Sequence, residues 1–204
     1  MRTPETTTTQ NPATRSTAAL LSTPDTLTGR VFLAVGASVL VAVAAHISLP
    51  LPFTPVPLTL SDLAVFAIGL TLGPVTAFSA LMLYLLEGAA GLPVFAPTGL
   101  GGIAQLLGPT GGYLLSYPLV ALTAALVARF ASRLTTRFVA GAVAAICASI
   151  VLFTFGTTWL AAEAHHTASA AIRVAVLPFV WGNLAKITAA AGIYSATQRW
   201  QTRS

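Results

Sequence analysis

The stretch FVAGAVAAICASIVLFTFGTTW, residues 138–159, runs for 22 residues without a single charged side chain. A helix needs about 20 mostly apolar residues to cross the hydrocarbon core of a bilayer. This stretch therefore predicts a helix that spans a membrane. Arginines stand shortly before it, at positions 129, 133 and 137, so the charged residues of this region lie outside the apolar run.

The whole composition points the same way. Of the 204 residues, 55% are hydrophobic and 7% are charged, and the mean hydropathy is +0.83. Soluble domains carry about 25% charged residues, so a water-facing surface cannot be built from this chain and most of its outside must face lipid. The net charge of +5 comes from scattered basic residues between apolar runs, which indicates topology signals and no nucleic-acid partner. The single Cys147 lies mid-span and allows no disulfide framework.

Counting similar runs predicts an all-α, polytopic bundle of six transmembrane helices. The expected spans are approximately residues 31–49, 61–72, 75–90, 113–130, 138–159 and 178–196. The second is too short to cross alone at about 1.5 Å per residue, so we expect it to tilt, to thin the bilayer or to borrow from the preceding loop. Residues 1–28 are rich in Thr, Pro and Ser and predict a disordered cytoplasmic tail, which leaves 29–204 as the membrane domain.

The arginines orient these six spans. With an even number of crossings, one side holds eight of them and the opposite side only Arg173, while Lys186 lies within a span. The eight are Arg2, Arg15, Arg30, Arg129, Arg133, Arg137, Arg199 and Arg203. Positively charged loops stay in the cytoplasm, so both termini are expected there and the protein in the plasma membrane.

Four polar residues are expected to meet in the outer part of the membrane, where each ionisable group costs at least about 2.5–3.5 kcal/mol. Lys186 lies eight residues past Pro178, about 12 Å into the last span. Asn183 is on the same helical face, and Glu87 and Asp62 stand at outer span ends. We interpret them as a polar pocket open to the outside. The alternatives are a snorkelling lysine, carboxylates that only neutralise it or lie among headgroups, and an interhelical hydrogen bond from Asn183.

The same residues do not favour catalysis. The only lysine follows Ala185 and no GxxxxGK[ST] phosphate loop exists, so no ATP hydrolysis by that route is expected. No nucleophile has an evident partner, and Glu163, His165 and His166 lack the ligand spacing of a metal site. We expect no enzyme, no metal and no cofactor. An ion-coupled carrier would need polar residues along whole spans, whereas the inner halves are nearly all apolar.

Three blocks in the chain resemble, in order and spacing, the signatures of the BioY family, the biotin-specific S components of energy-coupling factor (ECF) transporters. They are TPVPLTL at 54–60, LYLLEGAAGLPVFA at 83–96 and LGPTGGY at 107–113. GNLAK at 182–186 is similar to the family's late motif, in which a Gly-Asp pair precedes a lysine. The resemblance covers about residues 30–198.

This resemblance implies a six-helix bundle that holds biotin in an outer cavity under a lid formed by the first loop. It also implies partners, a transmembrane coupling subunit and two ABC-type ATPases, and delivery of the ligand as the S component topples within the membrane. The chain departs from the family pattern at Asn183, where aspartate is common, and at Ser61, where glutamine is common. A carboxylate of Asp62 or Glu87 would then balance Lys186. An S component for another vitamin is the alternative.

The expected contacts suit biotin, which has a carboxylate, a ureido group and an apolar ring. Lys186 can meet either the carboxylate or the ureido oxygen, and Asn183 can both donate to and accept from the ureido group. Tyr84 can supply a wall and a hydroxyl. Backbone N–H groups of the glycine-rich stretches 98–102 and 108–112 can hold an anion, unless they only shape loops. The site residues from these stretches are Gly101, Gly102 and Thr110.

One row of small residues is a candidate surface for contact with a partner subunit. Ala34, Ser38 and Ala42 follow one another at four-residue spacing along the first span, which permits close helix contact. The resemblance implies that this row faces the coupling subunit, and internal packing is the alternative.

The arginine count gives a direct test of orientation. A cysteine introduced near Arg133 is expected to react with a membrane-impermeant thiol reagent only from the cytoplasmic side, because that loop belongs to the arginine-rich side. Labelling of intact cells compared with inside-out vesicles measures this, and labelling from outside would overturn the topology.

Overall fold

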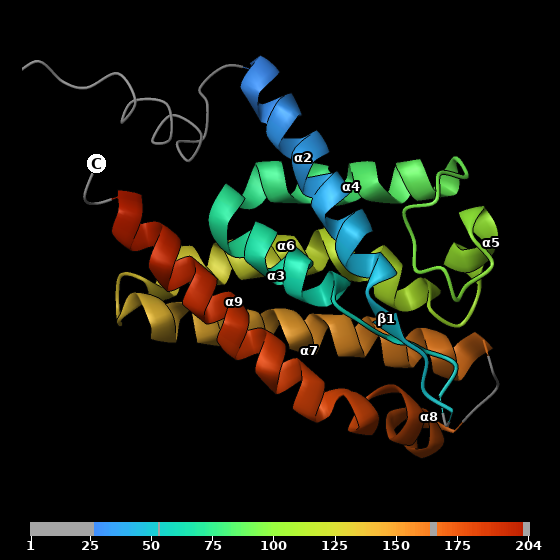
Figure 1. Cartoon of the computed structure of the whole chain (residues 1–204). Coiled ribbons are helices and arrows are strands. Elements are labelled where there is room, and N and C mark those ends of the chain that lie inside the picture. Colours follow the sequence, from blue (N-terminus) through green and yellow to red (C-terminus); the bar gives the residue numbers. More distant parts are fainter. Residues whose placement is uncertain (1–26, 53, 164–166, 202–204) are drawn as a thin grey trace, which may run out of the picture.

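The computed structural model describes residues 27–52, 54–163 and 167–201, and most of these are helical (Figure 1). Among them are six long helices: α2 (Leu27–His46), α3 (Ser61–Leu72), α4 (Pro74–Ala89), α6 (Gly111–Ala131), α7 (Arg137–Glu163) and α9 (Val180–Gln201). Shorter elements are α5 (Gly102–Leu107), α8 (Ala168–Ala175) and the 3₁₀ turn η1 (Leu177–Phe179). Each predicted span corresponds to one long helix, with boundaries that differ by a few residues.

The prediction of an all-α fold needs one correction. Residues after α2 form a short antiparallel pair of strands, β1 (Ser48–Leu49) and β2 (Leu58–Thr59), in which Ser48 pairs with Thr59. The first span therefore ends at His46 and not at Leu49, because the chain turns into the hairpin before its prolines. Helices α5 and α8 lie in regions predicted as loops. The predicted tail, residues 1–28, lies outside the described residues except for Leu27 and Thr28, which belong to α2; His165 and His166 also lie outside them.

By length and composition, four helical stretches in the described part of the chain can cross a membrane: α2, α6, α7 and residues 170–200, which include all of α9 but its last residue. Helices α3 and α4 are apolar but shorter, with 12 and 16 residues. The chain is thus a multi-pass membrane protein. The count of six crossings stays a prediction.

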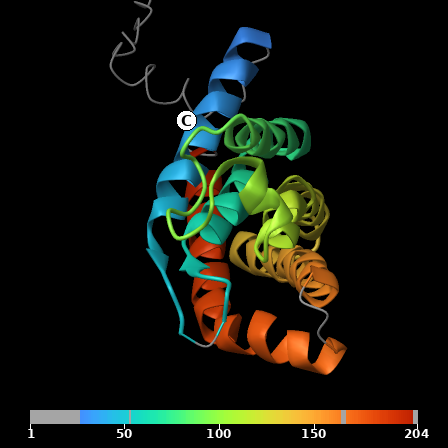
Figure 2. The same cartoon turned by 90° about the vertical axis from the view of Figure 1, so that its right-hand side faces the viewer.

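Helix α3 lies in the middle of the bundle, with α2, α4, α6 and α9 packed around it (Figures 1 and 2). Each of its residues is buried or half-buried. It ends at Gly73, whose φ of +78° favours glycine, and Pro74 begins α4 at once. Because neighbouring helices cover its sides, the thickness of the bilayer does not set its length.

The helices approach closely because small residues line their contacts. Gly69 of α3 faces α6 so closely that an added Cβ would lie 2.6 Å from the carbonyl oxygen of Ala121. Alanines of α6 and α7 are buried in the core of the bundle, and Ala124, Ala144 and Ala148 are fully buried. Small residues are the usual means of close helix packing in membranes, where burial of apolar side chains from water supplies little driving force.

The two ends of the bundle differ in chemistry. At one end, Arg137 at the start of α7 donates from Nη1 to the carbonyl oxygen of Gln198 near the end of α9, at 2.5 Å. The connection between α6 and α7 and the last turns of α9 therefore lie together, on the left in Figure 1, whereas α5 and α8, which carries Arg173, lie on the right. The side of the membrane on which each of these ends lies stays a prediction.

The close approach at Gly69 gives a prediction of stability. Gly69→Ala is expected to lower the free energy of unfolding by about 1–3 kcal/mol, because the new methyl group meets backbone of α6 that cannot move aside. Gly36→Ala on α2 is the matched control, since nothing lies within 4 Å of its added Cβ. Thermal unfolding in detergent measures both, and equal melting temperatures would contradict the packing.

Candidate binding site

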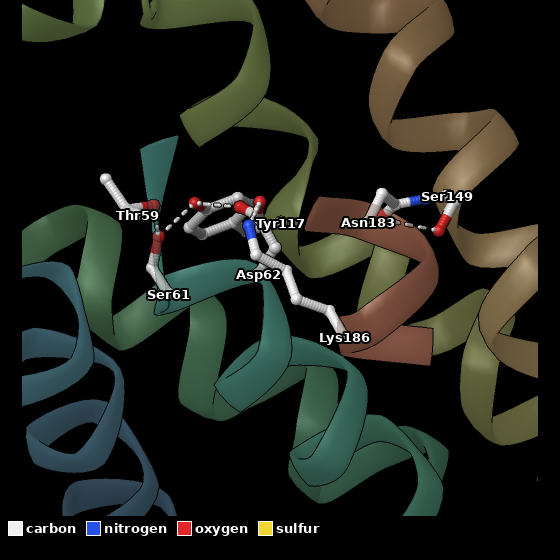
Figure 3. Close-up of polar contacts among 7 residues, drawn as sticks. All are labelled: Thr59, Ser61, Asp62, Tyr117, Ser149, Asn183 and Lys186. Carbon is white, nitrogen blue, oxygen red and sulfur yellow. Dashed lines mark hydrogen bonds and ion pairs between the residues drawn. The ribbon is translucent and has the colours of Figure 1, made fainter. Parts of the chain in front are cut away.

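An ion pair joins the last helix to the second long helix of the bundle, α3. The Lys186 Nζ atom on α9 lies 2.7 Å from Asp62 Oδ2 on α3 (Figure 3). The two side chains are 11% and 21% exposed. Of the two carboxylates that the sequence offers as partners for the lysine, the structure pairs Asp62. The pairing offsets the cost of holding each charge away from water.

A chain of hydroxyl groups supports the other oxygen of Asp62 (Figure 3). Tyr117 on α6 donates its single hydroxyl proton to Asp62 Oδ1 at 2.9 Å. Its oxygen then accepts from Ser61 Oγ at 2.7 Å, and Ser61 accepts from Thr59 Oγ1 on strand β2 at 2.5 Å. Each bond polarises the next, so the hydrogen bonds of the chain strengthen one another.

Asn183 lies one helical turn before Lys186 and is 9% exposed. Its Oδ1 accepts from Ser149 Oγ on α7 at 3.3 Å, which holds the carboxamide between α7 and α9 (Figure 3). The interhelical bond weighed as an alternative thus exists, and Asn183 also lines the pocket beside the ion pair. A carboxamide carries two N–H donors as well as the oxygen, so a contact with Ser149 leaves it able to bind a ligand.

Aromatic side chains form the walls of this pocket. Tyr84 is fully buried and stacks on Tyr117, with ring centroids 6.2 Å apart, and meets the edge of Phe95 at 5.4 Å. Its hydroxyl donates to the carbonyl oxygen of Val94 at 3.1 Å, so the ring is fixed in place. The remaining aromatic lining comes from α6, α7 and η1: Tyr113, Phe153 and Phe179. A polar end within aromatic walls is typical of a small-molecule site.

Five of the eight predicted ligand-contacting residues line this pocket: Lys186, Asn183, Asp62, Tyr84 and Thr110. The other three lie elsewhere. Glu87 accepts a hydrogen bond from Ser38 on α2, the helix that packs against this side of α4. The expectation that both carboxylates approach Lys186 is therefore wrong for Glu87 in this structure.

The two glycines are placed by backbone geometry. Gly101 and Gly102 have φ of +72° and +59° and form the turn into α5, outside the pocket lining. The Gly101 N–H donates to Gln105 Oε1 at 3.1 Å, within the same turn. In this structure Gly101 and Gly102 shape the loop, which was the alternative to anion binding. Their contact with a ligand stays a prediction.

The small-residue row of α2 faces the bundle in part. Ser38 is fully buried and donates to Glu87, whereas Ala34 and Ala42 are half-buried against the core. In this structure the row serves internal packing. Its contact with a coupling subunit stays a prediction.

Sequence reasoning missed several lining residues, notably Tyr117, Tyr113, Gln105 and Phe153. Tyr117 lies within an apolar span, and its hydroxyl, together with those of Tyr113 and Ser116, was the local signal that one face of that span is polar. Ser61 was noted as a departure from the family pattern, but its bond to Tyr117 depends on the crossing of α3 and α6, which no local pattern specifies.

Comparison with known proteins identifies relatives along most of the chain. The sequence profile described as the BioY family matches residues 12–203. A probable biotin transporter BioY of Pyrococcus horikoshii is 36% identical over 74% of this chain and 85% of its own length. The biotin transporter BioY of Thermotoga maritima is 38% identical over the same shares, and BioY2 of Lactococcus lactis is 32% identical over 76% and 81%.

A solved structure has the same fold. The crystal structure of the S component for biotin from an ECF-type ABC transporter superposes with a TM-score of 0.76. The alignment covers 86% of this chain and 95% of the other at 20% sequence identity.

The ion pair predicts coupled stability. Asp62→Asn and Lys186→Met are each expected to lower the free energy of unfolding by about 3 kcal/mol, because each leaves one buried charge without its partner. The double variant removes both charges and should recover much of that loss. Unfolding in detergent without added ligand measures this cycle, and purely additive effects would show that the two residues do not interact.

Proposed function

This chain belongs to the BioY family, and from that premise we propose that it captures biotin from outside the cell as the S component of an ECF-type transporter. The relatives named above as biotin transporters support the choice of ligand. The observation that carries the proposal is the Lys186–Asp62 pair at one end of an aromatic-walled pocket.

The ion pair matches the ureido group of biotin. That group presents one carbonyl acceptor and two N–H donors. Lys186 offers N–H donors and Asp62 offers carboxylate acceptors within 2.7 Å of each other, and Asn183 beside them supplies both kinds of group. The aromatic rings of Tyr84 and Tyr117 would lie against the apolar face of the bicyclic ring.

The charge balance favours the ureido end over the carboxylate end at Lys186. Asp62 already neutralises the ammonium group, so a ligand carboxylate placed there would lie within a few ångströms of a like charge. The neutral ureido group meets no such repulsion. This also accounts for Asn183 where the family commonly has aspartate, since Asp62 supplies the negative charge.

For topology we propose six crossings with both termini in the cytoplasm and residence in the plasma membrane. The grouping of arginines and the contact between Arg137 and the end of α9 support a common side for those segments. The covering of α3 by its neighbours supports a crossing by a helix of 12 residues.

The partners proposed are a transmembrane coupling subunit and two ABC-type ATPases, because the chain has no phosphate-binding loop of its own. Helix α2 is the most peripheral of the candidate spans. In its most apolar stretch 17% of the residues are buried, whereas 56% are buried in the corresponding stretch of α6. Its outward apolar side chains would face lipid or the coupling subunit: Val31, Phe32, Val35, Val39, Leu40 and Val43. Ala34 and Ala42 stand at the edge of that face.

Loss of the lysine should weaken ligand binding. Lys186→Ala is expected to raise the Kd for biotin at least tenfold, about 1.5 kcal/mol, because a hydrogen bond from a charged donor is lost. Isothermal titration of biotin into the protein, purified in detergent without biotin, measures the change.

Thr188→Ala on the same helix is the matched control, because Thr188 is exposed and its hydroxyl bonds only to carbonyl oxygens of α9. A folded wild-type protein that gives no heat with biotin would refute the proposed ligand. An unchanged titration of Lys186→Ala beside a normal wild type would refute only the role of the lysine.

A further inference from the structure

A second cavity adjoins the pocket at the end away from the ion pair. It lies between the loop of the β1–β2 hairpin and the glycine-rich loop that leads through α5 to α6. The two cavities share three lining residues: Pro57, Gln105 and Thr110. Lys186, Asp62 and Asn183 line only the first cavity. The shared residues therefore form the boundary between an inner pocket and an outer one.

Gln105 is the buried polar side chain at this boundary, with 5% exposure. Its Oε1 accepts from the Gly101 N–H at 3.1 Å, and its Nε2 donates to the carbonyl oxygen of Ala96 at 3.5 Å. Gly99 leaves room for the carboxamide, since an added Cβ there would lie 2.4 Å from Gln105 Cδ. The side chain is thus held in one orientation by its own loop.

This fixed carboxamide lies apart from the ion pair. Gln105 belongs to α5, which packs on α4 and α6, whereas Lys186 belongs to α9, which packs on α3 and α7 (Figure 1). Among the described residues that line the two cavities, Lys186 is the only cation, and Asp62 neutralises it. An anionic group at the far end of a ligand must therefore be met by neutral donors. Gln105 and Thr110 supply them at the boundary.

We infer that Gln105 determines specificity for the acidic tail of the ligand, by donating an Nε2 hydrogen bond to the tail carboxylate where the two cavities meet. This inference rests on the proposed function, with the ureido ring at Lys186 and Asp62. A carboxamide has two N–H groups, so one continues to bond Ala96 while the other faces the tail. A hydrogen bond to a carboxylate is stronger than one to a neutral acceptor. Gln105 therefore favours a ligand whose tail ends in a carboxylate over the same ligand with an amide at that end.

The test compares biotin with biotinamide, in which a neutral primary amide replaces the carboxylate. Gln105→Glu keeps the shape of the side chain but sets a negative charge against the tail. The ratio of the Kd for biotin to the Kd for biotinamide is expected to rise at least tenfold over wild type. Gln105→Met, which keeps the length and removes the donors, should raise the same ratio severalfold.

If Gln105 only shapes the loop, its substitution would change the affinities for biotin and for biotinamide by the same factor. An unchanged ratio in folded variants, with or without loss of affinity, would therefore overturn the inference. Melting temperatures establish that each variant is folded, and the Met variant tests the inference should the Glu variant misfold.

Two further variants separate this inference from the proposed function. Leu107→Ala on the same short helix is the control, because Leu107 is exposed and lines neither cavity. Lys186→Ala is expected to weaken biotin and biotinamide by the same factor, since the two ligands share the ureido ring. Wild-type protein that binds neither ligand would refute the proposed function itself, whereas normal binding with an unchanged ratio would refute only the role of Gln105.

Discussion

The polar part of this molecule depends on the ion pair that joins α9 to α3 inside a lipid-facing bundle. Lys186 and Asp62 come from helices far apart in the sequence, and each charge is costly there without the other. Their contact fixes where α3 meets α9. Tyr117, Ser61 and Thr59 then extend the network from α6 to the hairpin. The aromatic walls surround this network, so the position of the pocket follows from the place where the two charges meet.

The six long helices could be predicted almost completely, because each is an apolar run bounded by charges, prolines or glycines, whereas the short helices α5 and α8 could not. The 22 uncharged residues at 138–159 lie within α7, and Gly73-Pro74 separates α3 from α4 as expected. The short α3 could be predicted as an apolar segment from its sequence. Its position among the other helices could not, because it depends on packing between distant segments.

The site was partly predictable for a related reason. An ionisable residue in an apolar run attracts notice wherever it lies, so Lys186 and Asp62 could be singled out. The direction in which each ionisable side chain points could not be predicted. Glu87 stands three residues after Tyr84, yet it turns to Ser38 on α2, and only the placement of α2 shows this. Gln105 lay in a stretch predicted as a loop, where helical periodicity gave no reason to assign it a face.

The hydroxyl chain has a mechanical consequence. It begins at Thr59, which belongs to the strand pair that borders the outer cavity, and ends at the carboxylate that holds the lysine. A displacement of β2 would move the Thr59 hydroxyl away from Ser61. Ser61, and through it Tyr117, would then have a weaker hydrogen-bond partner. A shift of the strand pair would thus weaken, through Ser61 and Tyr117, the hydrogen bond that supports the Asp62 carboxylate.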